Sequence, residues 1–379
     1  MKIVIEAQHA CTATPIGIGR YAVSLIRTLV KRRENQYALA FFDHEKKAGN
    51  LRLMKQHFGD LGIPFCECNE ISYFDAFSRE GFAPYDSYMK SNGDVYHFLH
   101  IIKIPETCNG QMVVTAHDAI PLIHPEWFEP RIVEYARYFI KRMKRLRLLV
   151  LADSECTKHD LVEYGELAEE DIIVIPLAYD TETCYQERNP ELLQKMGVDA
   201  PYFLYFGTVD ARKNLPVLLD AFEMLTERYT DLKLVIAGTN SYSGLCVRDE
   251  IQRFRNTERL IILGTASDYE RRALFSQAIA FVFPSLYEGF GIPALESFAC
   301  GCPLIASNKS ALPEVTGNAA LLADPYNVEE FSFHMERLLN DNILRSEMIQ
   351  KGLDRAQEFS WDKTAAFTEQ AYEIAMNRR

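Results

Sequence analysis

Short runs of apolar and β-branched residues alternate along the chain with longer segments in which apolar residues recur every three or four positions. This alternation is typical of β-α-β units whose strands form a parallel sheet. In the first half it predicts five or six strands, within KIVIEA, QYALAFFD, DVYHFL, QMVVTAHD, LLVLADS and DIIVIPLA. Residues 18–33 and 130–145 show clear helical periodicity. Ser267 and Glu270 have the spacing of a capping box and predict a further helix start.

The pattern is interrupted after Tyr179 by a polar stretch with turn residues and no strand character. It then restarts, and a second set of strands is predicted within YFLYFGT, LKLVIAG, LIILG, AIAFVFPS, PLIAS and AALLAD. We therefore predict an α/β chain with two similar domains, residues 1–180 and 181–360, and a last helix at 361–379. Residues 45–92 are polar and aromatic with weak periodicity, and their structure is left open.

The composition indicates a globular protein, because 379 residues with 48% apolar content can bury a large core. The first residues, MKIVIEAQHA, lack the features of a secretory signal, and no apolar run approaches the about 20 residues that span a bilayer. We expect a cytoplasmic protein. The nine cysteines are scattered, which favours reduced thiols and no metal site. A net charge of −12 argues against a nucleic-acid partner.

The stretch AIAFVFPSLYEGFGIPALESFAC predicts a buried strand, a glycine-rich loop and a short helix. In a doubly wound sheet this loop faces the ligand crevice. The backbone N–H groups of Gly289 to Gly291 and of the helix amino end would then form a cradle suited to a diphosphate. Glu288 and Glu296 flank this cradle, so that one carboxylate could bind ribose hydroxyls and the other the hydroxyls of a sugar. Alternatively, Glu288 is a solvated loop residue and Glu296 caps the first helical turn.

A second candidate lies in GTVDARKN, where Arg212 and Lys213 follow a predicted strand and precede a helix. Two adjacent cations at the carboxyl end of a strand can neutralise a leaving diphosphate. The alternative is surface charge at a helix start, where cations are mildly unfavourable. The chain contains no D-x-D sequence that could hold a metal-clamped nucleotide sugar.

Two further candidates lie in the first half. Gly17, Gly19 and Ala22 fit the dinucleotide pattern G-x-G-x-x-A, but about ten residues separate them from the preceding strand, so the sequence is weak evidence for an NAD site. A flexible loop and an ordinary helix start remain the alternative. His117 ends a predicted strand, where a lone histidine is often a packed, hydrogen-bonded residue.

The spacing of Glu288 and Glu296, with the intervening G-F-G, resembles the E-x-x-x-x-x-x-x-E motif of the retaining glycosyltransferases of family 4, which have the GT-B fold. The likeness extends over YFLYFGTVDARKNLPVLLDAF, ALPEVTGNAALLADP, DSECTKHDL and GIGRY, and so over most of the chain. It implies two Rossmann-like domains facing across a cleft, with the helix at 361–379 crossing back to the first domain. Lys158 and Ser310 match family positions as well.

The resemblance implies roles for these side chains. Arg212 and Lys213 would bind the donor diphosphate, Glu296 the ribose, Glu288 the sugar, and His117 the sugar from the other domain. The glycine loop near residue 17 would approach donor phosphate or acceptor. The predicted catalytic residues are Arg212, Lys213, Glu288 and His117. The predicted donor-binding residues are Gly17, Gly19, Gly207, Arg212, Lys213, Glu288, Gly289, Phe290, Gly291, Ile292 and Glu296.

The implied activity is transfer of a hexose, with mannose from GDP-mannose favoured, to a saccharide or lipid-linked saccharide acceptor in bacterial glycan biosynthesis. The transfer would retain the anomeric configuration and require neither cofactor nor metal. A sugar-nucleotide epimerase and a non-catalytic nucleotide-sugar receptor are the alternatives, and a dehydrogenase ranks last.

One helical segment is rich in cations within an otherwise acidic chain. A basic amphipathic helix can lie on an anionic membrane, which would place the protein on the inner face of the membrane. A solvated helix face explains the pattern equally well. The cations are Arg131, Arg137, Lys141, Arg142, Lys144, Arg145 and Arg147.

Overall fold

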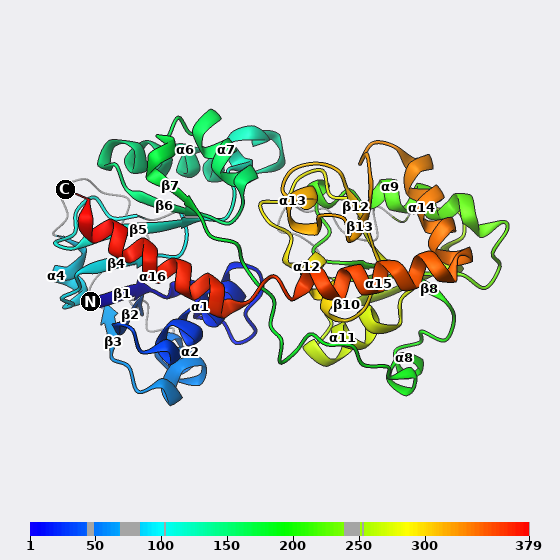
Figure 1. Cartoon of the computed structure of the whole chain (residues 1–379), viewed down its shortest axis with the longest axis horizontal. Coiled ribbons are helices and arrows are strands. Elements are labelled where there is room, and N and C mark those ends of the chain that lie inside the picture. The colour runs from blue at the N-terminus through cyan, green and yellow to red at the C-terminus, as the bar shows by residue number, and fades with distance from the viewer. Residues whose placement is uncertain (44–48, 69–83, 102–103, 239–250, 252–253, 379) are drawn as a thin grey trace. The chain divides into compact units, whose positions relative to one another are not determined.

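The computed structural model describes residues 1–43, 49–68, 84–101, 104–238, 251 and 254–378. The chain forms two compact units (Figure 1). The first unit comprises Met1–Leu177 and Ser360–Arg379, and the second comprises Ala178–Phe359.

The first unit is built on a parallel sheet of seven strands in the order β3-β2-β1-β4-β5-β6-β7. Six of these strands lie within the predicted runs. β3, however, falls in the part of residues 45–92 whose structure was left open, and residues 44–48 and 69–83 lie outside the described residues. The strands are β1 (Lys2–Glu6), β2 (Gln36–Phe42), β3 (Phe65–Cys68), β4 (Val95–Phe98), β5 (Gln111–Ala116), β6 (Leu149–Ala152) and β7 (Ile172–Val174).

Helices pack against this sheet and cover a core that includes Tyr96, Phe98, Val114 and Val150. The two helices predicted from periodicity are α1 and α6, and both begin at the predicted residue. The helices are α1 (Ile18–Arg32), α2 (Asn50–Phe58), α4 (Tyr85–Met89), α5 (Ile120–Ile123), α6 (Pro130–Leu146), α7 (Glu155–Glu163) and α16 (Trp361–Asn377).

The second unit repeats this plan with six parallel strands in the order β10-β9-β8-β11-β12-β13. All six lie within the predicted runs. The strands β8, β11 and β12 are buried almost throughout, and a strand buried on both faces reads as a continuous apolar segment. The strands are β8 (Tyr202–Phe206), β9 (Lys233–Ala237), β10 (Leu260–Gly264), β11 (Ala280–Phe283), β12 (Leu304–Ser307) and β13 (Ala320–Ala323).

The helices of the second unit complete a core that includes Phe203, Tyr205, Leu234 and Val282. The capping box predicted at Ser267 and Glu270 is present at the start of α11. The helices are α8 (Pro190–Lys195), α9 (Leu215–Thr226), α11 (Asp268–Gln277), α12 (Ile292–Ala299), α13 (Leu312–Thr316), α14 (Val328–Asn340) and α15 (Asn342–Ala356).

Both sheets have the doubly wound order, in which the chain starts at a central strand, builds outward in one direction and then returns to build in the other. The order reverses between β1 and β4 in the first unit and between β8 and β11 in the second. Ligands of such sheets bind beyond the carboxyl ends of the strands at this switch point.

The last helix, α16, belongs to the first unit although 182 residues of the second unit precede it, and it packs along α1 and the sheet (Figure 1). Polar contacts fix its position. The buried Glu369 carboxylate accepts hydrogen bonds from Arg32 Nε at 2.7 Å and from the Tyr37 hydroxyl at 2.9 Å. Tyr372 Oη lies 2.8 Å from His97 Nδ1 in β4.

Replacing Glu369 should therefore loosen α16. In Glu369→Ala, Arg32 and Tyr37 lose a charged partner, and a hydrogen bond to a charged group contributes about 2 kcal/mol. Urea unfolding followed by tryptophan fluorescence measures this, since Trp127 and Trp361 both belong to the first unit. Glu373→Ala, at an exposed position of the same helix, is the control. Equal unfolding midpoints for the two variants would contradict the role of Glu369.

His97 predicts a pH dependence of the same unit. Burial holds its pKa at about 3, whereas histidine in the unfolded chain titrates near 6.5. Below pH 6.5 the unfolded chain gains a proton that the folded chain does not take up until about pH 3. Stability should therefore fall over this range, by up to about 1.4 kcal/mol per pH unit for this residue. The non-titrating His97→Gln should flatten the dependence in urea unfolding between about pH 7 and 5, and an unchanged slope would refute the assignment.

Candidate functional site

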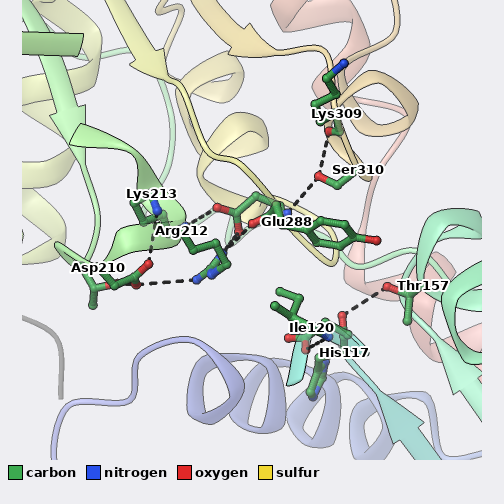
Figure 2. A network of polar contacts seen from close by, with 12 residues as sticks. His117, Ile120, Thr157, Asp210, Arg212, Lys213, Glu288, Lys309 and Ser310 are labelled. Carbon is green, nitrogen blue, oxygen red and sulfur yellow. Dashed lines mark hydrogen bonds and ion pairs between the residues drawn. The ribbon is translucent and has the colours of Figure 1, made fainter. Parts of the chain in front are cut away.

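The candidate cations and one candidate acid meet at the switch point of the second sheet. Arg212 and Lys213 follow β8, and Glu288 follows β11, the strand beside it. Lys213 Nζ lies 2.6 Å from Glu288 Oε1, and Arg212 Nη1 lies 2.7 Å from Glu288 Oε2 (Figure 2). Each oxygen of the Glu288 carboxylate thus forms an ion pair with one of the two predicted cations.

This cluster is buried, which decides between the alternatives for Glu288. Glu288 and Lys213 are each 7% exposed, so Glu288 is not a solvated loop residue. Lys213 Nζ also lies 4.8 Å from the centre of the Phe283 ring, in cation–π contact. Arg212 donates a further hydrogen bond to the Tyr287 carbonyl at 2.9 Å, which fixes its guanidinium against the loop.

The charges in the cluster are strongly coupled. Burial alone would raise the pKa of Glu288, but the charges of Arg212 and Lys213 lower it to about 2. Burial lowers the pKa of Lys213, and the Glu288 carboxylate opposes that effect. Breaking a buried pair by removing one partner is costly because it leaves an uncompensated charge. The cluster therefore holds desolvated positive charge that needs an anionic partner.

Asn214, next in the chain after Lys213, is a site residue that our sequence analysis missed. Its backbone is left-handed, with φ of 55°, and its side chain is buried. The amide Nδ2 donates to the Pro284 carbonyl at 3.1 Å and to the Pro325 carbonyl at 2.7 Å. Asn214 thereby joins the loops that follow β8, β11 and β13. An asparagine directly before a predicted helix could have indicated this position, because asparagine tolerates the left-handed backbone conformation.

The predicted glycine-rich cradle starts directly after Glu288. Gly291 has φ of 105°, and a Cβ there would approach Leu312 to 2.8 Å, so glycine is required. Among the described residues, none accepts a hydrogen bond from the N–H groups of Phe290, Gly291 or Ile292. Gly291 precedes α12 as its N-cap. Ser310 Oγ accepts a hydrogen bond from Glu288 N at 2.9 Å and so supports the same loop (Figure 2).

Glu296 lies apart from the Arg212 and Lys213 pair and has its own cation. It is the fifth residue of α12, beyond the first turn, so the helix-capping alternative is wrong. Its Oε1 lies 2.8 Å from Arg271 Nη1, and each side chain is 5% exposed. No pattern in the sequence indicated this partner. Gly207, the other predicted donor residue of this unit, directly follows β8 with φ of 142° and donates its N–H to the Ala237 carbonyl.

The remaining candidates belong to the first unit. His117 Nδ1 lies 2.7 Å from the Asp153 carboxylate, and Nε2 lies 3.0 Å from the Leu99 carbonyl. Burial alone lowers the pKa of His117, but Asp153 and the Leu99 carbonyl together raise it above its ordinary value. Both contacts therefore favour the protonated form of His117. Its predicted contact with a sugar stays a prediction.

The glycines near residue 17 form the entry to α1. Gly17 is its N-cap with φ of 49°. A Cβ at Gly19 would approach the His9 carbonyl to 2.8 Å, so close packing against the loop after β1 explains this glycine. Lys158, which matched a family position, is paired with Glu169 at 3.2 Å.

Comparison with known proteins identifies the chemistry. Residues 191–355 match the family model of glycosyl transferases group 1. The chain is 28% identical over 376 residues to the O-antigen chain mannosyltransferase B of Escherichia coli, covering 94% of this chain and 96% of that protein. It is 29% identical over 287 residues to the MMP alpha-(1->4)-mannosyltransferase of Mycolicibacterium hassiacum, covering 70% of this chain and 64% of that protein.

Solved structures show the same architecture. Sucrose-phosphate synthase from Thermosynechococcus elongatus matches with a TM-score of 0.72 at 17% identity, covering 99% of both chains. Alr3699/HepE of Anabaena, in complex with UDP and glucose, matches with a TM-score of 0.75 at 16% identity, covering 99% of this chain and all of that one. The chain is a glycosyltransferase with the GT-B fold.

In this glycosyltransferase the basic helix α6 is largely neutralised. Lys144 pairs with Glu166 at 2.6 Å, Arg147 with Asp171 at 2.8 Å, and the buried Arg142 with Glu106 at 2.9 Å. Arg145 also contacts Glu106. The other cations of α6 are Arg131, Arg137 and Lys141, and all three are exposed. None of the described helices is long and apolar enough to cross a bilayer.

Substitution of Asn214 should separate its two contributions. Asn214→Gly keeps the left-handed backbone but leaves two buried carbonyls without a donor, at a cost of about 2 kcal/mol. Asn214→Ala loses the same bonds and adds about 1 kcal/mol of backbone strain. Thermal unfolding by circular dichroism measures both. Should Asn214→Gly be as stable as the wild type, the amide would have no role in joining the loops.

Proposed function

We propose that this glycosyltransferase moves mannose from GDP-mannose to a saccharide or lipid-linked saccharide acceptor in bacterial glycan biosynthesis, with retention at the anomeric carbon. The buried cluster of Arg212, Lys213 and Glu288 at the switch point carries the proposal for a diphosphate donor. The choice of mannose rests on the mannosyltransferases to which the chain is similar.

The cluster suits a leaving diphosphate. Lys213 is buried, Arg212 is partly buried, and both are held by Glu288, so they need little reorganisation when charge develops on the departing phosphate. We infer that Glu288 holds their place until the donor binds, because a carboxylate and a phosphate offer these cations the same charge and acceptor geometry. The N–H groups of Phe290, Gly291 and Ile292, at the amino end of α12, would receive further phosphate oxygens.

Once the diphosphate binds the cations, the Glu288 carboxylate would accept hydrogen bonds from hydroxyls of the sugar, and Glu296 from those of the ribose. Retention requires no protein nucleophile. The acceptor oxygen forms the new bond to the anomeric carbon on the face from which the phosphate leaves. The departing phosphate oxygen takes the acceptor's proton. Positive side chains replace a metal ion in this scheme, and these features fit family 4.

Incubation with GDP-mannose and a mannose-terminated acceptor tests the proposal, with the product linkage read by nuclear magnetic resonance. An α-linked product is expected. Conversion of the donor to an isomer without acceptor would indicate an epimerase, and binding without turnover a receptor.

A thermal-shift screen of GDP-, UDP- and ADP-sugars, with NAD included, tests which donor the protein binds. Sedimentation with anionic and neutral liposomes tests peripheral attachment to the cytoplasmic face, which would act through the exposed cations of α6.

Removing one cation should slow transfer strongly. Loss of one preorganised charge costs about 3 kcal/mol, so Arg212→Ala and Lys213→Ala should each lower kcat by about 10²-fold. Steady-state kinetics with circular dichroism of the folded variants measures this. Lys195→Ala, at an exposed position in α8, is the control and should be near wild type.

A double variant separates chemistry from folding. Lys213→Ala alone leaves Glu288 with one partner fewer, which could by itself disturb the loop. Lys213→Ala combined with Glu288→Gln removes that unbalanced charge. If the double variant recovers wild-type turnover, Lys213 serves only to neutralise Glu288, and its proposed contact with the leaving group is refuted.

A further inference from the structure

A second buried ion pair lies beside the candidate site, between Arg271 of α11 and Glu296 of α12. Arg271 is 4% exposed and Glu296 is 4% exposed. The two are separated by 25 residues in the chain, and β11 and the glycine-rich loop intervene. The pair therefore joins α11 to α12 and depends on how these two helices meet in the tertiary structure.

Arg271 is held on its other side by the segment that opens the second unit. Its Nη2 donates to Thr183 Oγ1 at 3.1 Å and lies 3.4 Å from Cys184 Sγ. The same nitrogen lies 3.1 Å from Asp268 Oδ1, one turn earlier in α11. Contacts on two sides of a planar guanidinium leave it little rotational freedom, so the direction of its bond to Glu296 is fixed.

This arrangement controls the charge and the direction of Glu296. A carboxylate buried without a cation tends to take up a proton, because burial disfavours the charged form. A protonated carboxyl group has fewer acceptor positions for neighbouring hydroxyls, whereas an ionised one can accept from two hydroxyls at once. Arginine stays charged in proteins, so it can keep Glu296 ionised under all working conditions.

We propose that Arg271 is a positioning residue for nucleotide recognition, holding Glu296 ionised and oriented to accept hydrogen bonds from the vicinal hydroxyls of the donor ribose. The inference rests on the proposed function, since it takes Glu296 as the ribose-binding acid. Arg271 acts through Glu296 and does not touch the donor. Its effect is therefore confined to the ribose and leaves recognition of the diphosphate by Arg212 and Lys213 intact.

Titration calorimetry with GDP, 2′-deoxy-GDP and 3′-deoxy-GDP tests this directly. In the wild type, removal of a hydroxyl bound by a charged acceptor should weaken binding by roughly tenfold or more. In Arg271→Met, the affinity for GDP should fall to that of the deoxy compounds, while the affinity for the deoxy compounds should stay nearly unchanged. Arg271→Lys, which keeps the charge but not the planar fork, should fall between the two.

Arg272 provides a matched control on the same helix. It pairs with Glu187 at 2.5 Å and lies over the ring of Tyr185. Arg272 therefore holds the segment at the start of the second unit, as Arg271 does, but its ion pair is with Glu187 and not with Glu296. Arg272→Met should keep the wild-type preference for ribose.

The outcomes separate the two proposals. If Arg271→Met weakens the binding of GDP and of the deoxy compounds equally, or keeps the wild-type preference for GDP over the deoxy compounds, Arg271 has only a structural role and the inference is overturned. If the wild type binds neither GDP nor UDP, the proposed nucleotide-sugar donor itself fails. If the wild type binds GDP without preference for the ribose hydroxyls, the role of Glu296 fails, and the diphosphate site remains.

Discussion

The candidate site depends on the cost of burying charge. Glu288, Lys213 and Arg212 meet within 2.7 Å at the junction of β8 and β11, where water is largely excluded. None of these charges is stable there alone, so each is held in place by the others. This mutual dependence keeps the cations desolvated and fixed before a substrate arrives, which is the condition under which a charge stabilises a transition state most. In the proposed function, a donor diphosphate would replace Glu288 as the anionic partner of these cations.

Hydrogen bonds join three loops around this cluster, those that follow β8, β11 and β13. Asn214 binds the carbonyls of Pro284 and Pro325, and the Leu286 N–H donates to the Arg212 carbonyl at 2.7 Å. The loop carrying the cations and the loop carrying Glu288 therefore move as one piece. The doubly wound topology makes this arrangement available, because the reversal of strand order leaves the carboxyl ends of β8 and β11 without a helix between them.

The same unit contains a second buried ion pair, which involves the other acid of the motif. Glu296 of α12 pairs with Arg271 of α11, whereas Glu288 pairs with Arg212 and Lys213. The two acids of the motif thus have separate cations, and their charges are balanced independently. In the proposed function, a diphosphate that binds Arg212 and Lys213 leaves the cation that pairs with Glu296 in place.

The sequence alone determined the fold class and the identity of most site residues. Twelve of the thirteen strands lay in continuous apolar runs, whereas the short β3, FCEC, contains a glutamate and lies in a polar and aromatic region. Arg212 and Lys213 were recognisable because two adjacent cations at a helix start are unfavourable without a ligand. Glu288 and Glu296 were recognisable from the spacing that flanks a glycine turn.

Only the tertiary structure decided how these residues pair. Lys213 and Glu288 are 75 positions apart, and no local pattern states that they meet. Arg271 looks like any arginine in an amphipathic helix, and its burial follows from α11 packing against α12 and residues 183–184. Four cations in and directly after α6 pair with carboxylates of other segments for the same reason. Propensity and periodicity act over a few residues, whereas desolvation and charge pairing depend on which distant segments exclude water together.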